Sequence, residues 1–231
     1  DDALTLLYEQ LINALSLQID DRAIIEAFNN VALYCYMRIA TRVALRPVSK
    51  PFPAHRHFDK NSGLLSVRDK RAHHKDERRL IVLTNALCQL LCSTSTLCDT
   101  LSARLAIQRP PALVMFLSVD ETDSCRWEHL SKTRVDAQIK TLIDDEVSSQ
   151  AFRHVAANAF LNASINDFSQ TSMNGFMNHS RSGTGLLSNY SLFDIRLIAA
   201  QQRERMQRDG EQITANDACV LDLINRLGSA L

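Results

Sequence analysis

Apolar residues recur at helical spacing in the first part of the chain. A stripe of leucines between residues 3 and 17 predicts one amphipathic helix. Asp20 and Asp21 are suited to the N-cap of a second helix. Its apolar stripe consists of Ile24, Ile25, Phe28, Val31 and Ala32. Pro47 cannot continue a helix and disfavours helical geometry at the residue before it. The second helix should therefore end near Leu45, which places Arg46 at an element boundary.

The next segment changes from helical spacing to short apolar runs separated by polar residues. Residues 59–63 have turn chemistry, and 64–68 and 78–83 read as strands on either side of a polar loop at 69–77. We expect two or three antiparallel strands with a basic loop at the tip.

The pattern downstream is again mainly helical. Leucines predict a long helix over 84–107, which the Ser93–Thr96 run could interrupt. An apolar stretch at 112–119 could be a buried strand, 120–126 resembles a turn, and helical sequence resumes over 127–143. Two further helices are expected after residue 190, over 192–206 and 216–227. The sequence thus predicts an α+β fold, mainly α-helical, with a small antiparallel sheet.

Composition adds few constraints to this pattern. The chain has 231 residues, of which 45% are hydrophobic, so it can bury a sizeable core. Length alone allows one domain or two small ones, and we expect a single domain. No apolar run is long enough to span a bilayer, and no signal peptide opens the sequence, so we expect a soluble intracellular protein. The six cysteines lack metal or framework spacing and are expected to be reduced thiols that pack in the core.

The charge is unevenly distributed, although the formal net charge is zero. Between residues 38 and 79, twelve lysines and arginines stand against four acidic residues, a net of +8. This clustering favours a phosphate-facing surface. A solvated surface without a partner is the alternative.

The residues with the most specific spacing lie between 151 and 194. An Arg153-His154 pair opens a helical run, Asn178-His179 follows, and a loop rich in serine and glycine leads to Tyr190. Each residue alone has an ordinary explanation as a surface, packing or loop residue. Their order and spacing together are harder to explain that way.

This order resembles the catalytic domain of the tyrosine recombinase, or phage integrase, family. In that family a His-x-x-Arg-His box opens a helix, a Gly-His pair follows, and a nucleophilic tyrosine lies about ten residues later. Arg153 and His154 match the first box, with Gln150 where the family usually has histidine. His179 matches the second, with Asn178 in place of glycine, and Tyr190 falls at the position of the nucleophile.

The resemblance extends upstream to two further positions. Arg46 looks like the arginine that begins the family's active site after a helix, and Lys70 looks like the lysine that the family carries in a hairpin. Lys75 lies in the same loop and could take the place of Lys70.

The resemblance implies a role for each matched residue. Arg46 and Arg153 would hold the non-bridging oxygens of a DNA phosphate, for which paired guanidinium donors are suited. Tyr190 would attack phosphorus, Lys70 would protonate the leaving 5′ oxygen, and His179 would donate a hydrogen bond to the phosphate. Gln150 could also bind the phosphate, but an amide cannot act as a general base.

The expected activity is metal-independent cleavage and rejoining of double-stranded DNA, with no cofactor. The resemblance further implies a tetramer on DNA, a location with the nucleoid in a bacterial cytoplasm and no membrane partner. It also implies that the chain is a catalytic domain without its N-terminal DNA-clamping domain. Two alternatives remain: a catalytically silent, recombinase-derived DNA-binding protein, and a helical interaction module.

Overall fold

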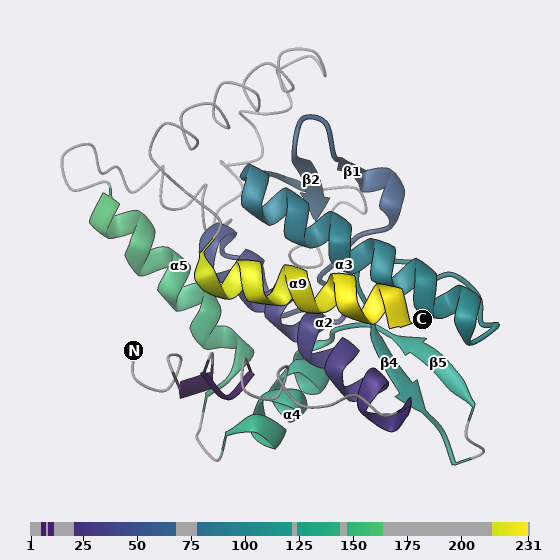
Figure 1. The fold of residues 1–231 in the computed structure, drawn as a ribbon. Coiled ribbons are helices and arrows are strands. Elements are labelled where there is room, and N and C mark those ends of the chain that lie inside the picture. Colours follow the sequence, from purple (N-terminus) through teal and green to yellow (C-terminus); the bar gives the residue numbers. More distant parts are fainter. Residues whose placement is uncertain are drawn as a thin grey trace.

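Figure 1 shows the fold in a computed structural model of the chain. The structure describes the following residues: 6–7, 9–11, 21–67, 78–121, 124–143, 147–163 and 214–230. The predicted N-terminal helix falls only partly within these ranges. Its residues Leu7 and Leu11 are fully buried in the core.

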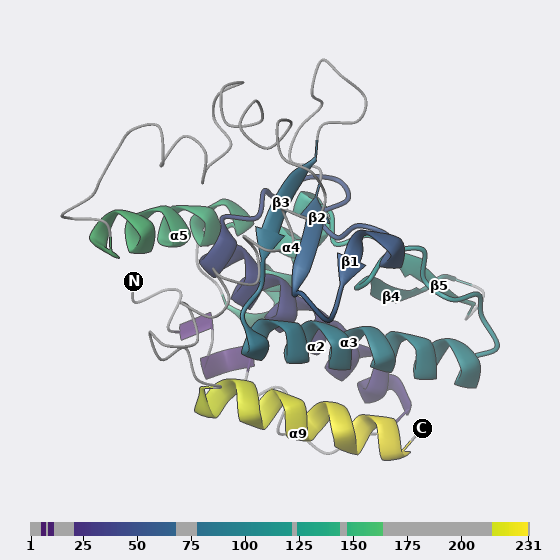
Figure 2. The same cartoon turned by 90° about the horizontal axis from the view of Figure 1, so that it is seen from above.

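Helix α2 (Asp21–Val43) is the central element. It packs against α3, α5, α9 and strand β4, and Figure 2 shows it between α9 on one side and α5 on the other. Every residue from Val31 to Thr41 is buried, so this part of the helix has no solvent face. The helix was predicted to end near Leu45 and ends at Val43, where Ala44 adopts the left-handed conformation with φ of 51°.

Helix α3 (Asn85–Arg104) begins where Thr84 caps it by accepting a hydrogen bond from the Leu87 amide. The prediction that the Ser93–Thr96 run could interrupt this helix is wrong. The Thr94 hydroxyl donates to the Leu90 carbonyl at 2.8 Å, one turn earlier, and its side chain is fully buried. Because this hydroxyl bonds to a carbonyl of the same helix, it does not compete for the backbone in a way that would end the helix.

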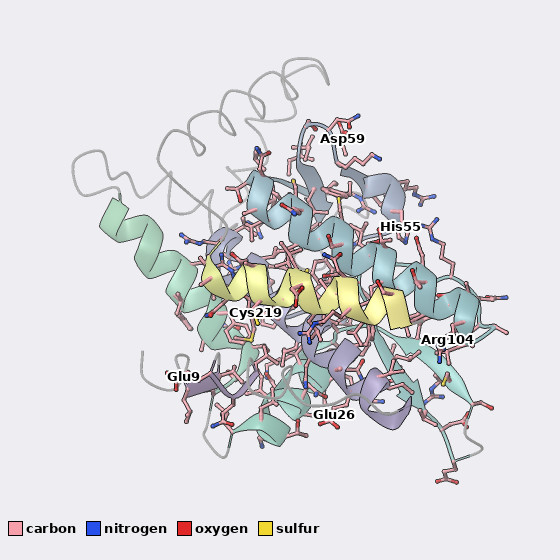
Figure 3. All side chains as sticks on the ribbon, in the orientation of Figure 1. Glu9, Glu26, His55, Asp59, Arg104 and Cys219 are labelled. Atoms are coloured by element: carbon pink, nitrogen blue, oxygen red, sulfur yellow. The ribbon has the colours of Figure 1, made fainter. Side chains whose placement is uncertain are left out.

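The predicted small sheet is present and has three antiparallel strands, β1 (Phe58–Asp59), β2 (Leu64–Val67) and β3 (Arg79–Val82), in that order. It follows a short 3-10 helix, η1 (His55–His57), and Figure 3 shows His55 and Asp59 at this side of the molecule. The Asp59 carboxylate accepts from the Asn61 amide and the Ser62 hydroxyl, which closes the predicted turn.

A second sheet is a two-stranded hairpin of β4 (Phe116–Val119) and β5 (Cys125–Glu128). Two predictions need correction here. The strand expected over 112–119 is formed only by the second half of that range, 116–119, and the turn expected over 120–126 ends before β5 begins at Cys125. Asn29 of α2 binds the hairpin through its side chain. Its Nδ2 donates to the Leu117 carbonyl at 2.9 Å, and its Oδ1 accepts from the Leu117 amide at 2.8 Å.

The helix predicted over 127–143 is shorter than expected, because its first residues belong to β5. Helix α4 (Lys132–Leu142) begins only after Ser131, which caps it by accepting from the Arg134 amide. The indole of Trp127 instead donates to the Gln108 carbonyl at 3.0 Å and packs edge-on against Phe28.

Helix α5 (Ser149–Ala163) packs against α2 and α4, and helix α9 (Ala215–Ala230) packs against α3 and α2. Helix α9 confirms the helix predicted over 216–227. The helix predicted over 192–206 lies outside the described residues.

A buried ion pair fixes the start of α9. Arg38 donates from Nε and Nη2 to the two oxygens of Asp217, each at 2.7 Å, and the Tyr34 hydroxyl donates to the same carboxylate at 2.9 Å. Thr214 and Asp217 also cap the helix reciprocally, each accepting from the other's amide at 3.1 Å.

These elements confirm the predicted class, a mainly helical α+β fold with small antiparallel sheets. One continuous apolar cluster joins α2, α3, α4, α5, α9 and both sheets. All six cysteines have free thiols, and three of them are buried (Cys35, Cys88, Cys98). Of the helices that the structure describes, none is both long and apolar enough to cross a membrane.

Candidate functional site at the end of α2

The last carbonyls of α2 are bound by two arginines from other elements. Arg79, the first residue of β3, donates from Nη1 to the Val43 carbonyl at 2.8 Å and from Nη2 to the Ala44 carbonyl at 3.2 Å. Arg153 of α5 donates from Nη1 to the same Ala44 carbonyl at 2.7 Å. The carbonyls at a helix end have no partner within the helix and carry partial negative charge, so guanidinium groups are favoured there.

Arg46 lies two residues after Ala44 and is half-buried. The sequence placed it at an element boundary, and the structure confirms that position. Because Arg153 binds the Ala44 carbonyl, the structure brings Arg153 to the short segment that carries Arg46. The two arginines proposed to hold a phosphate therefore come from α5 and from the end of α2, which pack together.

The Arg153 side chain is not at the surface, since the residue is only 3% exposed. Gln150 and His154 on the same helix are exposed. Gln150 precedes Arg153 by three residues, so the two lie on neighbouring parts of one helix face. Gln150 is therefore exposed one turn before the buried Arg153.

The remaining predicted site residues lie outside the described residues. These are Lys70, its alternative Lys75, His179 and Tyr190. The segment with Lys70 is nevertheless bounded on both sides, because Val67 of β2 pairs with Arg79 of β3. The segment that carries Lys70 therefore connects β2 to β3, and the first residue of β3 is Arg79, whose side chain binds the end of α2.

Aromatic rings pack beneath this region. Tyr36 of α2 contacts Phe52 and Phe152 edge-on, with ring centroids 6.3 and 6.0 Å away. Burial raises the pKa of the Tyr36 hydroxyl and Asp136 adds to the rise, which outweighs the opposite effect of the Arg153 charge. Tyr36 is therefore neutral near pH 7, and as a fully buried residue it is not placed to attack a substrate.

The predicted basic segment is only partly available to a phosphate. Arg38 was counted in it, and that prediction is wrong for this residue, because Arg38 is 8% exposed and paired with Asp217. The exposed basic residues of the described part of the segment are Arg42, Lys50, Arg56 and Lys60. Among the residues that the structure describes, no group of three or more histidine, cysteine or acidic side chains could hold a metal ion.

Sequence reasoning did not identify Arg79. The only signal was its place beside Arg78, directly before the apolar residues of β3. Its partners are backbone carbonyls, and these leave no trace in the sequence.

In comparisons with known proteins, no family model and no curated protein matches this chain.

Proposed function

We propose that this chain cleaves and rejoins double-stranded DNA through a covalent tyrosyl intermediate, as a tyrosine recombinase does. The observation that carries the proposal is the bond from Arg153 to the Ala44 carbonyl, two residues from Arg46. Arg46 and Arg153 are far apart in the sequence, and the proposed chemistry needs them side by side.

The chemistry assigns one task to each residue. The Tyr190 oxygen attacks phosphorus, the bond from phosphorus to the 5′ oxygen breaks, and Lys70 supplies the proton that this oxygen takes up. Water accepts the phenolic proton, because Gln150 cannot. Arg46, Arg153 and His179 stabilise the charge on the non-bridging oxygens, and aimed donors of this kind contribute about 3 kcal/mol each.

A trapping experiment tests the proposal directly. A pool of duplexes with random central sequence, each nicked close to its centre, releases a short fragment after cleavage and so prevents rejoining. The wild-type chain should become covalently attached to a 3′ phosphate, which a denaturing gel detects. Tyr190→Phe should bind the pool equally well and form no adduct.

Arg104→Met is a suitable control for this experiment. Arg104 is exposed at the end of α3, and Figure 3 shows it remote from the end of α2, so its loss should leave adduct formation unchanged. Adduct formation by Tyr190→Phe would refute the assigned nucleophile, and no adduct with the wild-type chain would refute the enzyme.

One observation favours the catalytically silent alternative. Arg153 is 3% exposed, and its Nη1 donates a hydrogen bond to a backbone carbonyl, as expected of an arginine with a purely structural role. A silent binder would retain the pool with an affinity that falls as salt rises, since bound phosphates release counterions, and would form no adduct. If the chain does not bind DNA, or binds it with an affinity that does not change with salt, the remaining alternative is a helical interaction module.

A further inference from the structure

Arg79 joins three segments that carry residues of the proposed site. It is the first residue of β3, the strand that follows the segment with Lys70 in the sequence. Its two terminal nitrogens bind consecutive carbonyls at the end of α2, just before Arg46. One of those carbonyls, that of Ala44, is also the acceptor of Arg153.

The shape of this contact restrains the chain that leads to Arg46. A guanidinium is planar, and its two donors are fixed relative to each other, so binding two carbonyls fixes the orientation of both peptide groups. Ala44 has a φ of 51°, an unfavourable value for a residue with a side chain, and it directs the chain out of α2. Arg79 holds this turn in place from outside the helix.

We propose that Arg79 is a positioning residue, which aligns Arg46 and Arg153 by holding the carbonyls at the end of α2. This inference rests on the proposed function. In this role Arg79 would act through Arg46 and Arg153 and would not itself contact the DNA. Its removal should leave DNA bound but the two guanidiniums misaligned, and misplacement by about 1 Å can cost on the order of 100-fold in rate.

The first test compares Arg79→Met with Arg78→Met in the trapping assay. Both variants remove one positive charge from neighbouring residues, but Arg78 donates to the Ser66 carbonyl of β2 at 3.4 Å, whereas Arg79 donates to the carbonyls at the end of α2. Arg79→Met should form adduct about 10 to 100-fold more slowly with nearly unchanged DNA affinity. Arg78→Met should stay within about threefold of the wild-type rate, as expected for a residue outside the reacting geometry.

A neutral substrate separates positioning from a general structural role. In a methylphosphonate duplex, one non-bridging oxygen at the cleaved position is a methyl group, so alignment of two guanidiniums matters less. The rate ratio of wild type to Arg79→Met should therefore shrink on this substrate. An equal ratio on both substrates would mean that Arg79 only supports the fold, and would overturn the proposal.

Salt dependence separates positioning from direct contact. If Arg79 bound a DNA phosphate, its loss would weaken binding and reduce the slope of log affinity against log salt by about 0.9. Such a change would also overturn the proposal.

Arg79→Lys covers the case in which Arg79→Met does not fold. It keeps the charge but can satisfy the two carbonyls less well, so it should be slowed on the natural substrate and partly rescued on the neutral one. If the wild-type chain forms no adduct, the proposed function fails and this inference with it. If it does, and both Arg79 variants match it, the positioning role alone fails.

Discussion

Tyr34 and Tyr36 lie two residues apart on α2 and are both fully buried, but their hydroxyl groups differ. The Tyr34 hydroxyl donates to Asp217 at 2.9 Å. The Tyr36 hydroxyl is buried, and among the described residues it has no hydrogen-bond partner. A buried hydroxyl without a partner costs free energy, whereas one bonded to a carboxylate contributes it.

Replacing each tyrosine with phenylalanine should therefore have unequal effects. We expect Tyr34→Phe to lower the free energy of unfolding by about 1.5 kcal/mol, because it removes a bond to a charged acceptor. Tyr36→Phe should change it by less than about 0.5 kcal/mol or raise it. Urea unfolding at pH 7 measures both, and an equal loss in the two variants would show that the Tyr36 hydroxyl has a partner.

At the scale of single elements, α3 shares one feature with α2, an alanine with positive φ just beyond its last residue. Ala106 follows α3 with a φ of 53°, and the Ile107 amide donates back to the Ser102 carbonyl at 3.0 Å. This arrangement usually has glycine at the left-handed position, because a side chain is unfavourable there. Ala106 is exposed, so its methyl group contributes little packing in return.

Ala106→Gly should consequently stabilise the protein, by about 1 kcal/mol, since the cost of a left-handed residue is removed. The unfolding midpoint should rise by about 2 to 4 °C for a chain of this size. Ala103→Gly is the matched control: Ala103 is exposed in the last turn of the same helix and has no positive φ, so glycine there should destabilise the protein by up to about 1 kcal/mol. Thermal unfolding of the two variants in parallel would contradict the reasoning if both shifted in the same direction.

The elements that the sequence predicted well are those whose pattern is local. Helix α2 follows from the spacing of Phe28 and Val31, and strands β2 and β3 from short apolar runs between polar turns. Strand β5 was missed although its four residues, Cys125–Glu128, alternate apolar and polar, because so short a run was assigned to the predicted turn before it and the predicted helix after it. It is a strand because β4 pairs with it, which the local pattern does not record.

The candidate site divides in the same way. Arg46 and Arg153 could be selected from sequence because their residue types and order resemble those of the tyrosine recombinase family. Arg79 could not, because its role depends on the path of the α2 backbone. Arg38 was misjudged for the related reason that its partner, Asp217, is 179 residues away.

At the scale of the whole molecule, the pair of Arg38 and Asp217 ties the last helix to the central one. Burial by itself would raise the pKa of the Asp217 carboxyl, but the bonds and charge of Arg38, helped by Thr214, hold it below its usual range. A carboxyl with a lowered pKa in the folded state stabilises the protein above the ordinary pKa of aspartate. This contribution is lost as the pH falls through the lowered value.

Asp217→Asn should cost about 3 kcal/mol at pH 7, because it leaves the buried Arg38 without its counter-charge. The difference from wild type should persist down to about pH 4, the ordinary aspartate pKa, and shrink below it. Unfolding by urea from pH 7 to pH 3 measures this. Asp222→Asn, on the same helix in an exposed pair with Arg226, should cost less than about 0.5 kcal/mol, and a similar loss in both would contradict the argument.

The amide of Asn29 has a consequence for self-association. In an antiparallel strand the two backbone groups of one residue point to the same side, so Leu117, bound to Asn29, turns both away from β5. The side-chain amide of Asn29 thereby occupies the backbone donor and acceptor of Leu117 on the edge of β4 that faces away from β5. A strand edge left open is a template onto which another molecule can add, and Asn29 removes that template where β4 would otherwise offer it.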